Sequence, residues 1–171
     1  MNQSTTKIYS LGYAEMRAWL TASVFVVGNL LLPQLCHLIP QGGFIFLPIY
    51  FFTLIAAYKY GAFVGVLTAV ASPLLNCALF GMPAPAMLPV ILIKSVVLAL
   101  AASYIASRTQ KVSLLSIALA VAAYQIIGSL AEWGITGSLT AALQDVRLGF
   151  PGILLQIYGG WAVLRFRINN K

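Results

Sequence analysis

The sequence predicts an all-α integral membrane protein, a bundle of six transmembrane helices. Hydrophobic residues make up 61% of the chain and charged residues only 8%, whereas soluble proteins carry about 25% charged residues. The mean hydropathy is +0.94. At 171 residues the chain has room for several spans of roughly 20 residues and little else. We therefore expect a single transmembrane domain over residues 1–171.

Apolar segments and the residues that interrupt them place the six spans. We expect these spans at residues 13–32, 44–58, 61–80, 89–107, 114–133 and 151–166. The N-terminal segment is too long and too evenly apolar for a cleaved signal peptide, so we expect it to be retained. Pro33 is predicted to end the first helix, and Pro73 to bend or break the third. Pro89 and Pro151 begin helices, a position that proline tolerates well.

Basic residues gather on one side of this predicted bundle. Lysine and arginine are enriched in the cytoplasmic loops of membrane proteins. One side carries Arg147, and the other carries Lys7, Arg17, Lys59, Arg108, Lys111, Arg165, Arg167 and Lys171. The net charge of +7 thus reports orientation rather than binding of nucleic acid. It predicts that both the N- and the C-terminus are cytoplasmic.

The remaining basic residue, Lys94, lies inside a predicted span. A charge at membrane depth costs at least about 2.5 to 3.5 kcal/mol, so it is rarely kept without a partner or a task. Lys94 follows Pro89 by five residues, which places it roughly 7 to 8 Å from the external end of its helix. Glu132, near the end of the fifth span, is its expected partner in an empty pocket.

Further polar side chains are expected in the same external half of the bundle. Gln125, for example, lies about two turns from Glu132 on the same helix face. A pocket for a small polar ligand accounts for the set, with a cation for a ligand carboxylate or phosphate and an acidic acceptor for a ligand N–H. Aromatic rings would supply stacking faces. The predicted substrate-binding residues are Lys94, Glu132, Gln156, Asn76, Gln125, His37, Trp133 and Tyr158. The alternative is an ion pair between Lys94 and Glu132 that only fixes helix register.

Motifs of catalysis and of metal binding do not occur in the sequence. It contains no CxxC or HExxH spacing, no phosphate-binding glycine loop and no Ser-His or Cys-His nucleophile motif. We therefore predict no enzyme activity, no metal site and no permanently bound cofactor. Cys36 and Cys77 alone do not make a disulfide framework. Without a nucleotide site, uphill transport requires energy from a partner or an ion gradient.

Small residues recur every four positions in the first span, at Ala14, Ala18 and Ala22. Lipid offers no hydrophobic drive for helices to associate, so close approach at small residues must supply the packing. Two interpretations are open. The alanine face packs within the same bundle, or it docks another membrane protein.

Together these features resemble the substrate-binding S component of an energy-coupling factor (ECF) vitamin transporter. The resemblance covers nearly the full length: six short spans, the alanine-spaced first helix, and the segments Gly81-Met82-Pro83 and Met87-Leu88-Pro89. It implies a vitamin or related micronutrient near the external face, capped by loops 34–43, 81–88 and 134–150 and lined by Lys94, Glu132 and Gln156. It also implies a bacterial cytoplasmic (inner) membrane. There the alanine face would meet a transmembrane coupling subunit joined to two cytoplasmic ATPases.

The Gly-Met-Pro and Met-Leu-Pro pairing resembles S components for cobamide-type precursors, but those often carry an acidic residue where this chain has Lys94. Two alternatives to an S component are also open. A related solitary group takes up cobalamin with a cysteine as cobalt ligand, and Cys77 is the candidate here. The second alternative is a structural or scaffolding membrane protein, in which the alanine face docks a partner and no ligand exists.

Overall fold

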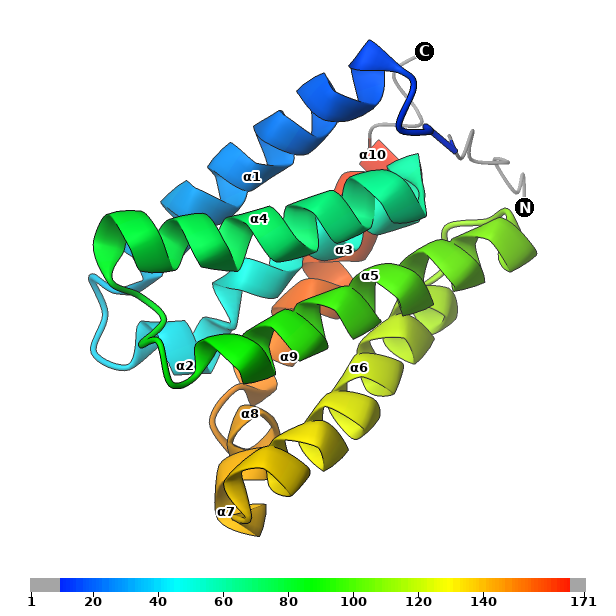
Figure 1. The fold of residues 1–171 in the computed structure, drawn as a ribbon. Coiled ribbons are helices and arrows are strands. Elements are labelled where there is room, and N and C mark those ends of the chain that lie inside the picture. The colour runs from blue at the N-terminus through cyan, green and yellow to red at the C-terminus, as the bar shows by residue number, and fades with distance from the viewer. Residues whose placement is uncertain (1–9, 167–171) are drawn as a thin grey trace.

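The computed structural model describes residues 10–166, and every regular element in that range is helical (Figure 1). Five segments are long and apolar enough to cross a membrane: Met16–Cys36, Gly42–Tyr60, Ala62–Phe80, Leu88–Thr109 and Leu114–Thr136. The described chain is thus a multi-pass membrane protein. The predicted all-α class and the membrane location are confirmed.

The five spans are built from seven elements. They are α1 (Met16–Cys36), α2 (Gly42–Phe46), the 3₁₀ turn η1 (Pro48–Tyr50), α3 (Phe51–Tyr60), α4 (Ala62–Phe80), α5 (Leu88–Thr109) and α6 (Leu114–Thr136). Two short helices follow, α7 (Leu139–Ala142) and α8 (Gln144–Arg147). The last described segment consists of α9 (Phe150–Leu154), the π-helical η2 (Leu155–Gly159) and α10 (Gly160–Phe166).

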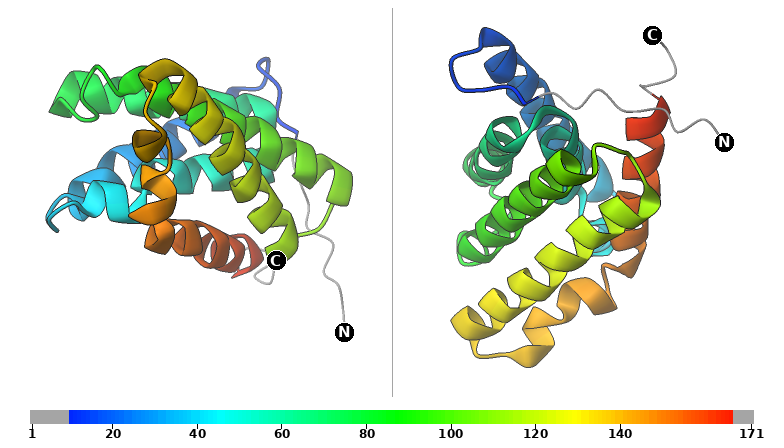
Figure 2. Two further views of the ribbon diagram at one scale, coloured as in Figure 1. Left: turned by 90° about the horizontal axis from the view of Figure 1, so that it is seen from below. Right: turned by 90° about the vertical axis from the view of Figure 1, so that its right-hand side faces the viewer.

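The sixth predicted span, residues 151–166, is not among the five long helices. Its segment is divided by η2, and at 1.5 Å per residue the range 150–166 extends only about 25 Å. It contacts α3 and α6. Figures 1 and 2 show it returning from the end of the bundle at α7 and α8 toward the end where α1 begins.

Pro33 lies inside α1, which continues to Cys36, so the prediction that this proline ends the helix was wrong. A proline has no N–H, and it therefore leaves the carbonyl four residues earlier without its helical partner. That carbonyl belongs to Asn29, and it accepts a hydrogen bond from Asn76 Nδ2 on α4 at 2.9 Å. Substitute donors of this kind are what allow prolines within membrane helices.

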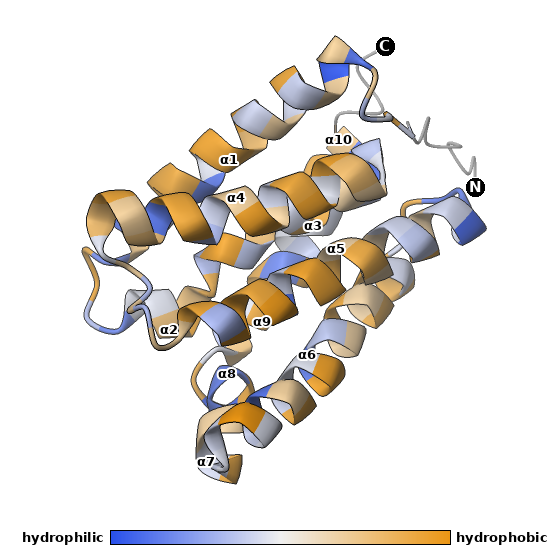
Figure 3. Cartoon of the chain, viewed as in Figure 1, coloured by the Kyte–Doolittle hydropathy of each residue, from blue (hydrophilic) through white to orange (hydrophobic). Residues whose placement is uncertain are grey.

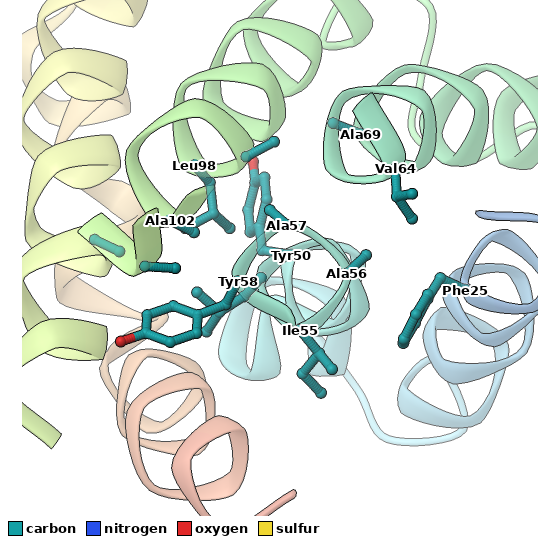
Figure 4. Close-up of a cluster of buried hydrophobic side chains, with 14 of the residues drawn as sticks. Phe25, Tyr50, Ile55, Ala56, Ala57, Tyr58, Val64, Ala69, Leu98 and Ala102 are labelled. Atoms are coloured by element: carbon teal, nitrogen blue, oxygen red, sulfur yellow. The ribbon is translucent and has the colours of Figure 1, made fainter. Parts of the chain in front are cut away.

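The hydrophobic core surrounds α3. All six residues from Thr53 to Tyr58 are buried, which is the pattern of a helix enclosed on every side. Figure 4 shows Phe25 of α1, Val64 of α4 and Leu98 of α5 converging on it. A Cβ added at Gly65 of α4 would lie 2.4 Å from the Cβ of Ala57, so only glycine permits the α3–α4 approach.

The two ends of the bundle differ in charge. At one end, which we call the basic end, the Tyr58 hydroxyl donates to the Lys111 carbonyl at 2.6 Å and Leu11 N–H to the Tyr60 carbonyl at 3.2 Å. The basic end carries Arg17, Lys59, Arg108, Lys111 and Arg165. At the opposite end lie α2, α7 and α8 (Figure 1). The predicted basic residues Lys7, Arg167 and Lys171 fall outside the described residues.

Apolar residues also cover the outside of the bundle between these ends. Most of the length of α1, α4, α5 and α6 is orange in Figure 3, whereas α8 and the connection between α5 and α6 are largely blue. On α1 the exposed apolar residues include Met16, Leu20, Val24, Leu31 and Leu35. An exterior of this kind suits hydrocarbon rather than water.

The alanine face of the first helix turns toward the chain's own core. Ala18 is 0% exposed and Ala22 is 1% exposed, and both belong to the core cluster with α3 and α4. Ala14 precedes the start of α1 and is exposed. In this structure the prediction of a docking face is therefore wrong for Ala18 and Ala22, because the bundle already fills the space beside them.

Candidate functional site

A cavity of about 290 Å³ opens at the end of the bundle opposite the basic end. Its volume lies near the lower limit of ligand sites, about 300 to 1,000 Å³. Apolar side chains form most of its wall, and a few polar groups are set among them. The lining residues are Pro33, His37, Gly43, Phe44, Leu47, Pro48, Ile49, Tyr50, Asn76, Met82, Pro83, Ala84, Met87, Val90, Ile91, Lys94, Glu132 and Asp145.

Three charged side chains meet in the wall of the cavity, and we call them the ion triad. Lys94 Nζ lies 2.5 Å from Glu132 Oε2 and 2.7 Å from Asp145 Oδ2. The Lys94 side chain is only 2% exposed, and the carboxylates of Glu132 and Asp145 are 8% and 14% exposed. The predicted pair of Lys94 and Glu132 is present in the structure. It has a second carboxylate that the sequence analysis missed.

Lys94 reaches the carboxylates by crossing α6 at a glycine. A Cβ added at Gly128 would lie 2.5 Å from Lys94 Cγ and 3.3 Å from Lys94 Cδ. The absence of that carbon lets the lysine stem lie against the α6 backbone. Glu132 follows Gly128 by one helical turn, on the same face. The spacing of Gly128 and Glu132 therefore places the carboxylate of Glu132 next to the ammonium group of Lys94.

Asp145 enters the site from the segment between α6 and α9. That segment was predicted to be a loop over 134–150, but it contains the end of α6 and the helices α7 and α8. Ser138 caps α7 by accepting a hydrogen bond from Ala141 N. A Cβ at Gly149 would lie 2.6 Å from Leu47 Cδ1, so this glycine lets the turn after α8 close onto the η1 region. The close fit places Asp145 in the cavity wall.

Tyr50 is a second lining residue that the sequence analysis missed. It is 3% exposed, and its ring packs 5.1 Å from that of Tyr124, centroid to centroid. Within residues 10–166 its hydroxyl makes no hydrogen bond. It faces the cavity because the second span is broken: Leu47 has φ of 47° and Pro48 starts η1. Pro48 was the available sequence clue to that break.

His37 and Asn76, two of the predicted substrate-binding residues, line the cavity, and both carry acceptor atoms. The Pro33 carbonyl can only accept, so His37 Nδ1–H donates to it at 2.6 Å. In the neutral ring Nε2 is then a bare acceptor. Asn76 uses Nδ2 to donate to the Asn29 and Ser72 carbonyls. Its Oδ1 receives only a long contact of 3.4 Å, from Gln34.

Four predicted site residues do not line the cavity. Gln125 is buried and donates to the Tyr124 hydroxyl at 2.9 Å, and Gln156 is 0% exposed within η2. Trp133 and Tyr158 are exposed on the outside. Successive residues of a helix point about 100° apart. Trp133 therefore points in a different direction from Glu132, which lines the cavity.

The three segments predicted as caps each contribute to the cavity wall. His37 and Gly43 come from 34–43, Met82 and Met87 from 81–88, and Asp145 from 134–150. Cys77 does not line the cavity, and Cys36 and Cys77 are free thiols. Within residues 10–166, no group of three His, Cys, Asp or Glu side chains is arranged to hold a metal ion.

No family model, curated protein or solved structure matches this chain. A small, mainly apolar cavity with charged and hydrogen-bonding groups at one wall can orient a compact organic molecule by its polar end.

Proposed function

We propose that the chain is the membrane-embedded substrate-binding subunit of an ECF-type importer. It captures a vitamin or similar micronutrient in the cavity, and partner subunits drive its uptake by hydrolysing ATP. The observation that carries the proposal is the cavity itself, which combines an apolar wall with the largely buried ion triad. Its polar lining consists of Lys94, Glu132, Asp145, His37, Asn76 and the hydroxyl of Tyr50.

The distribution of charge supports an external position for the cavity. Arginine and lysine mark the cytoplasmic side of membrane proteins, and in residues 10–166 they concentrate at the basic end. The five spans run alternately between the two ends. The segment Phe150–Phe166 returns to the basic end, and we infer that it makes a sixth, shorter crossing. With this topology both termini are cytoplasmic in a bacterial inner membrane, and the cavity opens outward.

Partners follow from what an importer needs. The lining residues include no site for nucleotide chemistry, so a transmembrane coupling subunit and two cytoplasmic ATPases supply the energy. Ala18 and Ala22 are occupied by the bundle's own packing, and the coupling subunit therefore contacts other surfaces. The cavity of about 290 Å³ favours a compact ligand. A corrinoid, with its macrocycle and side chains, is too bulky for it.

The test is binding by purified protein. Thermal unfolding is measured in detergent with each member of a panel of vitamins and precursors. A ligand at 100 times its Kd stabilises the folded state by about 2.7 kcal/mol. Mass spectrometry of small molecules that copurify provides an independent readout. One vitamin or precursor should raise the melting temperature, and the same compound should be found in the purified protein.

A structural protein, in which the ion triad only fixes helix register, makes the opposite prediction. No compound in the panel would change the melting temperature and none would copurify. Uptake of vitamins by cells would also be unaffected by loss of the chain. That combination of results would refute the importer proposal.

A further inference from the structure

The ion triad has a net negative charge, which bears on the class of ligand that the cavity accepts. One ammonium group faces two carboxylates, for a formal charge of −1. In the described structure Lys94 is the only lysine or arginine that lines the cavity. Arg147 lies on α8 close to Asp145 in the sequence, but it is exposed and does not line the cavity.

Lys94 is therefore a poor binding group for an anionic ligand. Two of its three N–H bonds already point to carboxylates at 2.5 and 2.7 Å. An anion that approached it would also meet Glu132 and Asp145, and like charges at short range in a largely buried site repel each other. Lys94 acts instead as an internal counter-ion that allows two carboxylates to lie side by side.

The other polar groups of the cavity are also mainly acceptors. Glu132 Oε1 and Asp145 Oδ1 accept no hydrogen bond from the described residues. Asn76 Oδ1 adds a neutral acceptor, and His37 Nε2 is an acceptor when the ring is neutral. The Tyr50 hydroxyl, 3% exposed and without a partner in residues 10–166, can accept as well as donate. A molecule that satisfies this wall must bring hydrogen-bond donors.

We propose that the cavity takes a small organic cation, in which a protonated amine or similar N–H-bearing group is attached to an apolar body. The cationic group binds beside Lys94, at the free oxygens Glu132 Oε1 and Asp145 Oδ1, and supplies the positive charge that the triad lacks. The apolar body lies against Phe44, Met82 and Met87, which line the cavity. This proposal rests on the binding function proposed above and specifies its ligand class.

The experiment uses two sets of probes that share a body and differ in charge. One set is tryptamine, indole-3-propanoate and 3-(2-hydroxyethyl)indole. The other is 2-phenylethylamine, 3-phenylpropanoate and 2-phenylethanol. Binding is measured as the shift in melting temperature of the full chain in phosphatidylcholine nanodiscs, which carry no net charge. A charged hydrogen-bonded contact contributes enough that the amine should bind about 10- to 100-fold more tightly than the neutral analogue.

Variants of Asp145 test whether the preference for amines depends on the ion triad. Asp145→Asn should weaken amine binding about 10- to 100-fold, and Asp145→Lys should shift the preference toward the carboxylate probes. Glu15→Gln is the matched control: it removes the third acidic residue of the chain, which is exposed beside the start of α1. That variant should bind the amines as the unmodified protein does.

The outcomes separate this proposal from the importer function. Equal or tighter binding of the carboxylate or neutral probes, or no shift with either amine, overturns the cation proposal. Amine binding that survives Asp145→Asn unchanged also overturns it. A negatively charged vitamin that copurifies and stabilises the protein would overturn the cation proposal and leave the importer function standing. Failure of the whole vitamin panel, with normal uptake in cells that lack the chain, would remove the importer function itself.

Discussion

Gly128→Ala tests how the ion triad is built. The new Cβ would lie 2.5 Å from Lys94 Cγ, whereas carbon atoms pack best at about 3.5 to 4.0 Å. The lysine stem must therefore move by about 1 Å. In the unmodified protein Lys94 Nζ lies 2.5 and 2.7 Å from its two carboxylates, so this movement disturbs both contacts. Overpacking of this kind costs about 1 to 3 kcal/mol. Replacing glycine within a helix recovers roughly 0.5 to 1 kcal/mol.

Gly134→Ala is the matched control on the same helix. No atom lies within 4 Å of a Cβ at this position, so the variant should be as stable as the unmodified protein or slightly more so. Thermal and denaturant unfolding in one detergent should place the free energy of unfolding of Gly128→Ala about 1 to 3 kcal/mol below that of Gly134→Ala.

A double-mutant cycle identifies the clashing atom. In a Lys94→Ala background Cγ is absent, so the penalty of Gly128→Ala should largely disappear. Residues in direct contact show such coupling, whereas independent sites add. Equal stability of the two glycine variants, or an unchanged penalty in the Lys94→Ala background, would refute the account of how Lys94 crosses α6.

Three further predictions concern single side chains. Lys94→Met should lower the free energy of unfolding by about 3 to 5 kcal/mol, because it leaves the buried Glu132 and the partly buried Asp145 without a counter-ion; unaltered thermal unfolding would show that the triad is not buried as described. Ala18→Leu should destabilise by about 1 to 3 kcal/mol through overpacking, whereas Leu20→Ala, on the exposed side of α1, should change stability little. Equal effects would place Ala18 outside the core. Trp133→Ala and Tyr158→Ala should leave ligand affinity unchanged in a binding titration, because neither residue lines the cavity, and a large loss of affinity would contradict that boundary.

Part of the candidate site could be predicted because charge is so scarce in this chain. A lysine within an apolar span requires a counter-charge, and the sequence offers only three acidic residues. Glu132 was found because it also lies within a span. Asp145 was missed because it lies between spans, where a charged residue needs no explanation. Considering each of the three acidic residues as a partner for Lys94 would have made Asp145 a candidate.

The predicted site residues that do not line the cavity show what helical spacing cannot decide. Gln156 and Gln125 were expected at the right depth, and both are buried, but neither lines the cavity. Depth along a helix follows from counting residues. The direction a side chain faces depends on how each helix is rotated within the bundle, and apolar residues on every face leave that rotation unmarked.

The sequence by itself determined the all-α class, five of the spans and the position of the charge that must be neutralised, because burial in lipid imposes length and apolarity on each helix. Only the tertiary structure decided which faces meet. Glycines illustrate the difference: Gly128 looks like any other apolar-span glycine until Lys94 is seen lying across it. The alanines of α1 likewise fit a partner as well as they fit the core. Contacts between segments distant in sequence decided the surroundings of Gly128 and of the α1 alanines. Such a contact also joins Asp145 to Lys94, 51 positions apart in the sequence.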